Sequence, residues 1–193
     1  MTEFSCVVLA AGAGTRFGGK KQDLLIDGQP LWQIVKEKAM ECSNDVIVVG
    51  VDIPGGAFRK DSVYSGIRYV KHERVVILEA ARPFVTVEQI CRIGDVPAPS
   101  ATYYMPSVET VLFAGMYLDR KGCTLLQTPQ AFETKMLLEA HECIRNMDAT
   151  DDTCLIKTCF GIEPVFLEGG PNLHKITYRD DVKLMKGAIW PSH

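Results

Sequence analysis

One stretch near the amino terminus indicates the fold class of this chain: Ser5-Cys-Val-Val-Leu-Ala-Ala-Gly-Ala-Gly-Thr-Arg-Phe-Gly-Gly-Lys-Lys-Gln22. Its first part, Ser5–Ala11, is an apolar run that predicts a buried strand. Its second part, Gly12–Lys21, predicts a glycine-rich turn that carries the cations Arg16, Lys20 and Lys21. Because ligands of open α/β sheets bind beyond the carboxyl ends of the strands, this turn is a candidate anion-binding site.

Two familiar phosphate-binding motifs come close to this turn. The dinucleotide fingerprint G-x-G-x-x-G fails, because Phe17 stands where its third glycine belongs. The phosphate loop fits through Gly14, Gly19 and Lys20, but Lys21 replaces the Ser or Thr that holds the metal ion. Taken alone, the turn also fits a flexible loop with solvated lysines.

The rest of the chain alternates apolar strands with helical periodicity. Further strands are expected at 45–51, 75–78, 164–167 and 175–177. Helices are expected at 31–42, at 62–70, after the Thr86–Gln89 capping box, at 133–146, from a cap at Thr150 to Gly161, and from Asp180 onward. Such nearly continuous apolar strands indicate an α/β fold with a mostly parallel central sheet, flanked by helices on both faces.

The proline-rich segment 96–121 breaks this alternation and predicts an extended β-arm that projects from the core. No repeat, low-complexity stretch or linker interrupts the chain, so residues 1–193 are expected to form a single domain.

Composition and charge exclude some classes of function. The net charge of −3, with basic and acidic residues interspersed, argues against nucleic-acid binding. No segment has the length of a membrane span or the pattern of a signal peptide, which predicts a cytoplasmic protein without a membrane partner. The seven cysteines include no C-x-x-C pair, so no zinc ribbon is expected. We expect these cysteines to be reduced and mostly buried.

Five blocks of the chain, in order, resemble the 2-C-methyl-D-erythritol 4-phosphate cytidylyltransferase family, whose members have a Rossmann-like fold. The blocks are Leu9-Ala-Ala-Gly-x-Gly-x-Arg16 with Lys21-Gln22; Gly55-Gly56-x-x-Arg59-x-x-Ser62-Val63; Ala80-Ala81-Arg82-Pro83-Phe84; Gln127-Thr128-Pro129-Gln130-Ala131-Phe132; and Thr150-Asp151-Asp152 followed by Asn172 through Lys175-Ile176-Thr177. The first block is common to many sugar nucleotidyltransferases, and the ordered set is specific.

The resemblance implies CTP, a small polyol phosphate and Mg²⁺ as ligands, and a homodimer formed through the arm. It implies that Arg16 and Lys21 are the catalytic cations facing the triphosphate. The residues implied in nucleotide binding are Ala10, Ala11, Gly12, Gly14, Gly55, Gly56, Arg59, Ser62 and Lys175. Those implied around the acceptor substrate are Arg82, Thr102, Arg120, Thr128 and Thr150. Arg120 would reach the active site of the second subunit.

Three departures from the family pattern stand out. Glu79 replaces the aspartate that helps to hold Mg²⁺, and is therefore the candidate metal ligand. Ala57 replaces an acidic residue after the glycine pair, and the stretch between Val51 and Gly55 lacks the family's usual helix and strand. A pentitol-phosphate cytidylyltransferase acting on ribitol 5-phosphate, and a catalytically silent nucleotide-binding paralogue, are the alternative functions.

Some residues of these blocks have simpler interpretations. Asp151 and Asp152 fall in the first turn of an expected helix, where carboxylates favour the helix dipole, so both are expected to be structural. The segment Gln127–Gln130, taken alone, is typical of a turn.

Overall fold

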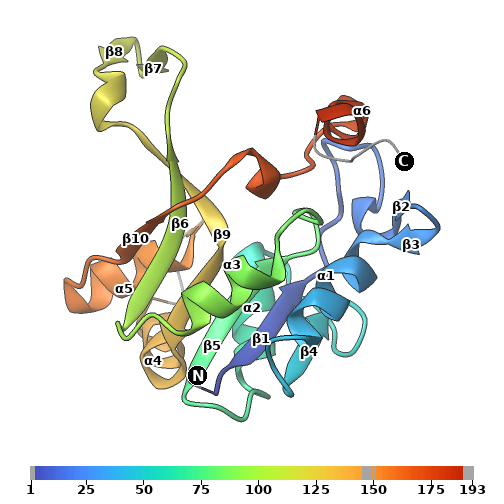
Figure 1. The fold of residues 1–193 in the computed structure, drawn as a ribbon. Helices are drawn as coiled ribbons and strands as arrows, with labels where there is room; N and C mark the ends of the chain where they lie inside the picture. Colours follow the sequence, from blue (N-terminus) through green and yellow to red (C-terminus); the bar gives the residue numbers. More distant parts are fainter. Residues whose placement is uncertain (1–2, 145–148, 150, 189–193) are drawn as a thin grey trace.

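The fold is built around one six-stranded sheet, seen in a computed structural model that describes residues 3–144, 149 and 151–188 (Figure 1). The strand order is β10-β6-β9-β5-β1-β4. These strands are β1 (Ser5–Leu9), β4 (Val46–Val49), β5 (Arg74–Glu79), β6 (Ser100–Pro106), β9 (Thr124–Glu133) and β10 (Val165–Glu168). β1 pairs in parallel with β4 and β5, and β10 with β6, whereas β9 is antiparallel to both of its neighbours. The expected mostly parallel sheet is confirmed.

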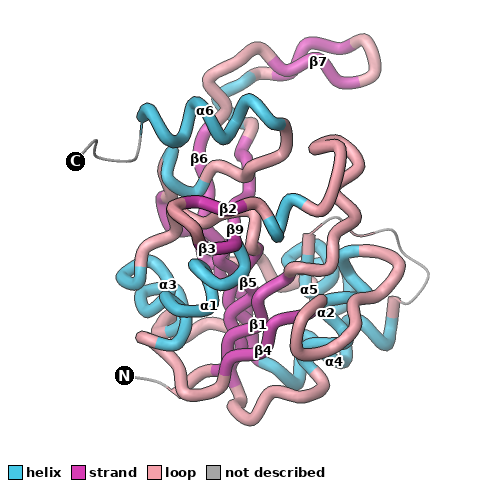
Figure 2. Tube along the Cα trace, turned by 90° about the vertical axis from the view of Figure 1, so that its right-hand side faces the viewer, coloured by secondary structure: helices cyan, strands magenta, loops and turns pink. Residues whose placement is uncertain are grey.

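Helices cover both faces of this sheet, as Figure 2 shows with the sheet seen nearly edge-on. The helices are α1 (Leu31–Met40), α2 (Arg59–Ile67), α3 (Val87–Gly94), α4 (Thr134–Cys143), α5 (Asp152–Phe160) and α6 (Arg179–Ala188). Successive side chains of β1 point to opposite faces, so Val8 packs with α1 and α3 while Val7 packs with α2, α4 and α5. Both valines are fully buried, which explains the nearly continuous apolar sequence of the strand.

The arm is formed by the outer ends of β6 and β9 and by a small hairpin between them (Figure 1). The hairpin pairs β7 (Val111–Phe113) with β8 (Met116–Leu118), and turns through Ala114 and Gly115, both of which have positive φ. Most of its apolar side chains are exposed. The arm starts later than the expected residue 96, because β6 belongs to the central sheet from Ser100 onward.

Local signals in the sequence placed several elements correctly. Thr86 accepts a hydrogen bond from the Gln89 amide while the Gln89 side chain accepts one from the Thr86 amide, which is the expected capping box of α3. Gly161 ends α5 in the left-handed conformation, with φ of 69°.

Three expectations about secondary structure were wrong or shifted. Helix α2 begins at Arg59 rather than at residue 62, because Asp61 accepts a hydrogen bond from the Phe58 amide and caps the helix there. Residues 175–177 form an irregular segment instead of a strand, although the Ile176 amide donates to Ala81 of the core. Thr150, expected to cap α5, lies outside the described residues, and the cap is Asp151.

The cysteines also differ from expectation. Cys42, just after α1, forms a disulfide with Cys91 of α3, so these two are not reduced thiols. The two helices lie side by side on one face of the sheet, which brings the Cα atoms to 5.6 Å. Of the five free cysteines only Cys6 is buried, and burial raises the pKa of its thiol to about 12.

Within the described part of the chain, no helix has the length and apolar character needed to cross a membrane.

Candidate active site

Two adjoining cavities lie beyond the carboxyl ends of β1 and β5. The larger has a volume of about 310 Å³ and the smaller about 170 Å³, and both are bounded by Gly12, Lys21 and Lys175. The larger cavity is lined by Leu9, Ala10, Ala11, Gly12, Ala13, Lys21, Gln22, Gly56, Ala57, Phe58, Arg59, Ser62, Glu79, Ala80, Ala81 and Lys175. Its volume falls in the range of small-molecule sites. Cavities therefore lie beyond the first strand, where the sequence predicts a ligand site.

The glycine-rich turn forms the wall of the smaller cavity. The Gly14 carbonyl accepts hydrogen bonds from the Phe17, Gly18 and Gly19 amides, which closes the turn into a compact loop. Gly14 has φ of +66°, and a Cβ there would collide with the Gly19 carbonyl oxygen, so the loop requires glycine at this position.

Arg16, Lys21 and Lys175 supply the charge of the smaller cavity. Arg16 is exposed, and no carboxylate in the described part of the chain forms an ion pair with it. The ammonium group of Lys21 donates to the Ile176 carbonyl at 3.0 Å, which fixes it beside the loop. Its pKa is lowered to about 8, first by burial and then by the neighbouring charge of Lys175. An anion in this cavity would relieve the repulsion between the two lysines.

The opposite wall of the larger cavity is made by the segment that leads into α2. The Ser62 hydroxyl accepts a hydrogen bond from the Gly56 amide at 3.1 Å. A Cβ on Gly55 would collide with the Ala11 side chain, and one on Gly56 with Asp61. These small residues therefore let two loops approach closely, which leaves backbone polar groups near the cavity.

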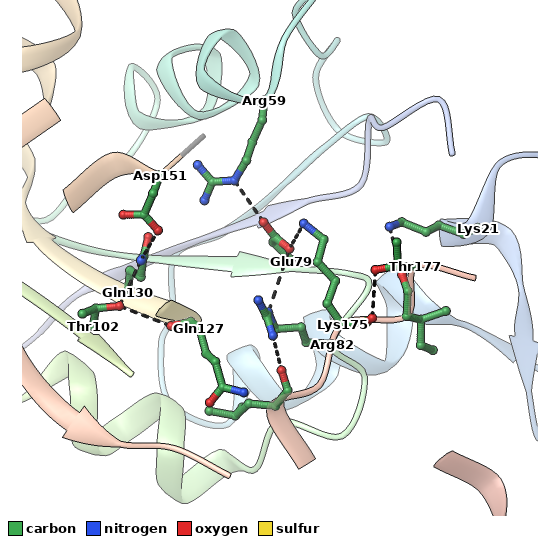
Figure 3. A network of polar contacts seen from close by, with 12 residues as sticks. Lys21, Arg59, Glu79, Arg82, Thr102, Gln127, Gln130, Asp151, Lys175 and Thr177 are labelled. Atoms are coloured by element: carbon green, nitrogen blue, oxygen red, sulfur yellow. Dashed lines mark hydrogen bonds and ion pairs between the residues drawn. The ribbon is translucent and has the colours of Figure 1, made fainter. Parts of the chain in front are cut away.

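Glu79 lies at the end of β5, at the floor of the larger cavity, and is surrounded by cations (Figure 3). One carboxylate oxygen lies 2.5 Å from the Lys175 ammonium and 3.9 Å from Arg82 Nε, and the other accepts from Arg59 Nε at 3.0 Å. Burial by itself would raise the pKa of Glu79, but the three cations hold it well below its ordinary value. Glu79 is therefore a carboxylate when the site is free.

Arg59 is held from its other side by a second buried carboxylate. Its Nη1 donates to Asp152 Oδ2 at 2.6 Å, and Asp152 is 1% exposed. The His141 ring, from α4, lies 3.4 Å from the other Asp152 oxygen. Burial disfavours the charged form of Arg59, yet Asp152 and Glu79 raise its pKa above the ordinary value. The Arg59 guanidinium is thus fixed between two carboxylates.

None of the four expected acceptor residues that the structure describes lines either cavity. Arg82 pairs with Glu79 and donates to the Leu173 carbonyl, so it lies behind the cavity floor. Thr102 is fully buried in the sheet, where its hydroxyl accepts from Gln130 Nε2 at 3.0 Å. Thr128 is also buried, and its hydroxyl oxygen has no hydrogen-bond partner.

Two more of these residues are separate from the cavities. Arg120 is exposed on the arm and donates to the Val108 carbonyl. Thr150 lies outside the described residues. The roles of the whole set in binding stay predictions.

The structure shows contacts of three side chains that the sequence did not predict. Asp152 was expected to be a helix-dipole residue, but it anchors Arg59. Asp151 accepts from Gln130 Nε2 at 2.6 Å, so it ties α5 to the central strand β9 (Figure 3). Phe58 lines the larger cavity and is 64% exposed. The sequence shows the acidic pair at the start of α5 and the aromatic residue before Arg59, but it does not show how far these side chains are buried or exposed.

A mostly parallel α/β sheet, with a glycine-rich loop and a group of cations around a cavity of this size, is typical of a nucleotide-binding protein. The profile of 2-C-methyl-D-erythritol 4-phosphate cytidylyltransferase (IspD) matches residues 33–189. The chain belongs to this family. Members of the family are CTP-dependent cytidylyltransferases of isoprenoid biosynthesis.

Individual relatives agree with this assignment. The chain is 30% identical to 2-C-methyl-D-erythritol 4-phosphate cytidylyltransferase of Aquifex aeolicus, over 95% of this chain and 96% of that protein. It is 28% identical to the bifunctional enzyme IspD/IspF of a Nitratiruptor species, over 100% of this chain and 56% of the relative. The crystal structure of the Thermus thermophilus cytidylyltransferase superposes with a TM-score of 0.81, at 26% identity, covering 96% of this chain and 98% of that one. The chain spans about half the length of the bifunctional curated relatives.

Enzymes of this family depend on a divalent metal ion, and the described residues do not fit such an ion by themselves. They contain no group of three or more His, Cys, Asp or Glu side chains that could hold a metal. Glu79, the expected ligand, is already paired with three cations. A divalent ion at its oxygens would be repelled by each of them by several kcal/mol, even at an effective dielectric constant of about 20.

Proposed function

We propose that this chain transfers CMP from CTP to 2-C-methyl-D-erythritol 4-phosphate and releases pyrophosphate. One observation carries the proposal: the glycine-rich loop, Arg16, Lys21 and Lys175 converge on the smaller cavity, which opens beside a nucleotide-sized one. Membership in the family supports the choice of CTP and of this acceptor. We further place the reaction in the cytoplasm.

The chemistry requires no general base. The second pKa of a phosphate monoester is about 6, so the acceptor phosphate is largely dianionic at neutral pH and is itself the nucleophile. One of its oxygens forms a bond to the α-phosphorus of CTP, and the bond from that phosphorus to the bridging oxygen of the β-phosphate breaks. Pyrophosphate leaves with the electron pair, in line with the attack.

The contribution of the protein is positional and electrostatic. Arg16 and Lys21 would contact the β- and γ-phosphates, and Lys175, on the boundary of both cavities, would contact the α-phosphate. These charges stabilise the negative charge that develops on the departing pyrophosphate. The small residues Ala10, Ala11 and Gly12 would let backbone groups reach the nucleotide, and Gly55, Gly56 and Ser62 would do so from the opposite wall.

The arm supports a homodimer as the working form. Leu112, Phe113, Met116 and Tyr117 expose apolar side chains at its tip, an arrangement typical of an interaction surface. Arg120 lines neither cavity of its own subunit. We propose that it completes the acceptor site of the partner. Mg²⁺ is the proposed divalent ion, but no step is assigned to it, since the described residues do not form its site.

The dimer predicts complementation between two inactive variants. An Arg16→Ala subunit mixed with an Arg120→Ala subunit forms heterodimers in which one active site has both arginines. With random exchange, about a quarter of the sites are intact, so about a quarter of wild-type activity should return. Activity that stays at the level of the separate variants would place both arginines in one subunit's site.

The proposed reaction is tested by pyrophosphate release. The purified protein, with Mg²⁺, is given each nucleoside triphosphate together with methylerythritol phosphate or ribitol 5-phosphate. Release only with CTP and methylerythritol phosphate is the expected result. Release with ribitol 5-phosphate would overturn the choice of acceptor, and CTP binding without release would mark the chain as a silent nucleotide-binding protein.

A further inference from the structure

The carboxylate of Glu79 connects the two halves of the nucleotide pocket. It links Lys175, which borders both cavities, to Arg59 at the start of α2, with distances of 2.5 and 3.0 Å. These residues come from β5, from the segment before α6, and from a helix on one face of the sheet (Figure 3). Because Glu79 is only 7% exposed, its pairs are poorly screened by water. It therefore fixes the direction of two cations that belong to different elements.

The surroundings of Glu79 oppose a metal ion while the site is free of nucleotide. Three cations lie within 4 Å of its oxygens: Lys175, Arg59 and Arg82. The other carboxylate that pairs with Arg59 is Asp152, and it contacts a different guanidinium nitrogen from the one that Glu79 contacts. A divalent ion at Glu79 would have to displace a buried ion pair without gaining a second protein carboxylate.

The second carboxylate extends the same chain of contacts into the core. Asp152 is almost fully buried and binds Arg59 Nη1, while Glu79 binds Arg59 Nε. His141 lies against the other oxygen of Asp152 and is itself 7% exposed. The aromatic ring of Tyr64, from α2, lies over His141. Arg59 thus makes a charge-assisted hydrogen bond to each of two buried carboxylates, which together fix its guanidinium.

We infer that Glu79 and Asp152 are positioning residues, which hold Lys175 and Arg59 toward the nucleotide, and that the divalent ion arrives bound to the nucleotide and not to Glu79. This inference rests on the proposed function, because it assigns these side chains roles in that reaction. Asp152 distinguishes a positioning role from metal binding. It lies on the far side of Arg59 from Glu79, so its removal alters the position of Arg59 without removing a metal ligand.

The test uses Glu79→Gln, Asp152→Asn and the control Glu163→Gln, which removes the carboxylate of the exposed pair Lys157–Glu163. Each protein is assayed for kcat, for the KM of CTP, for the Mg²⁺ concentration that gives half-maximal rate, and for its melting temperature. Misplacement of a cation by about 1 Å costs on the order of 10²-fold in rate. We expect losses of about that size in kcat for Glu79→Gln and Asp152→Asn, none in the control, and an unchanged Mg²⁺ requirement in all three.

A second measurement needs neither turnover nor a folded variant. Free Mn²⁺ is followed by electron paramagnetic resonance as it is added to the wild-type protein without nucleotide, and then again with CTP present. Because CTP itself binds Mn²⁺ in solution, the same titration of CTP without protein is subtracted. After this subtraction, we expect Mn²⁺ bound to the protein only with CTP. One Mn²⁺ bound per chain without nucleotide would overturn the inference, and so would a tenfold higher Mg²⁺ requirement in Glu79→Gln alone. Wild-type kcat in a folded Asp152→Asn protein would remove the positioning role of Asp152.

Failure of the proposed function has a different signature. A wild-type protein that releases no pyrophosphate with any acceptor contradicts the proposed reaction, whereas the Mn²⁺ titration still decides whether the protein binds the ion without nucleotide.

Discussion

The lowered pKa of Lys21 predicts that kcat/KM for CTP depends on pH through the ionisation of this one side chain. In the free protein, burial and the charge of Lys175 lower this pKa from 10.5 to about 8. The side chain is therefore about nine-tenths protonated at pH 7 and about one-tenth protonated at pH 9. Only the protonated form can pair with the triphosphate. Since kcat/KM reports the ionisation of the free enzyme, kcat/KM for CTP should fall about tenfold between pH 7 and 9.

The matched variant is Lys21→Arg, whose guanidinium stays charged over this range. Its kcat/KM, lower in absolute value, should be flat from pH 7 to 9. In the wild-type protein the bound triphosphate raises the pKa of Lys21, so the fall in kcat should be displaced to higher pH than the fall in kcat/KM. If kcat/KM of the wild-type protein did not change between pH 7 and 9, or if it fell equally in Lys21→Arg, the pH dependence would not come from Lys21.

The same pKa has a consequence for stability. Between pH 8 and 10.5 the unfolded chain binds more protons at Lys21 than the folded protein does. The contribution of Lys21 to the free energy of unfolding therefore rises with pH across this window, and is least favourable below pH 8. Denaturant titrations of wild type and Lys21→Met at pH 7.5 and 9.5 measure the difference. A gap between the two proteins that does not change with pH would contradict the lowered pKa.

The remaining predictions concern three other features. Arg16→Ala should lower kcat on the order of 10²–10³-fold, as loss of a transition-state donor does, with an unchanged melting temperature; a retained kcat would remove Arg16 from the reaction. Phe58→Ala should weaken CTP binding about tenfold in calorimetry, because a stacked aromatic side chain is lost. An unchanged affinity for CTP would show that Phe58 only borders the cavity. Cys42→Ser with Cys91→Ser should lower the free energy of unfolding by about 2–4 kcal/mol under oxidising conditions, and mass spectrometry that finds both wild-type thiols free would contradict this.

Much of the fold was predictable because local and long-range signals agree. In Ser5–Leu9 the apolar run, the following glycines and the burial on both faces all favour a parallel strand. The capping box at Thr86 and the left-handed glycine at position 161 are local devices that act through the nearest backbone, so sequence alone identifies them.

The central strand β9 is not among the strands expected from the sequence. Polar residues and Pro129 made the segment from Gln127 resemble a turn, because a proline in a central strand removes a ladder hydrogen bond. The structure places this segment at the register shift opposite Thr102 and Tyr103, and the buried side chain of Gln130 finds Thr102 and Asp151. These partners are distant in sequence, so no local signal announces them.

The candidate site likewise has a part that the sequence predicts and a part that it does not. The loop from Gly12 to Lys21 was predictable because its glycines and cations act locally, and position 14 requires a conformation that glycine adopts without strain. The pairing of Arg59 with Asp152 was not, since 93 residues separate them and only the packing of α2 against α4 and α5 brings them together. The role of Glu79 likewise depends on which cations the fold delivers to it.

A crystal structure of the protein with CTP and Mg²⁺ would show directly where the triphosphate binds. We expect the triphosphate against the loop between Gly12 and Gly19, with Arg16 and Lys21 within hydrogen-bonding distance of its β- and γ-phosphate oxygens. A triphosphate bound elsewhere, or these two side chains turned toward solvent beside a bound nucleotide, would contradict it.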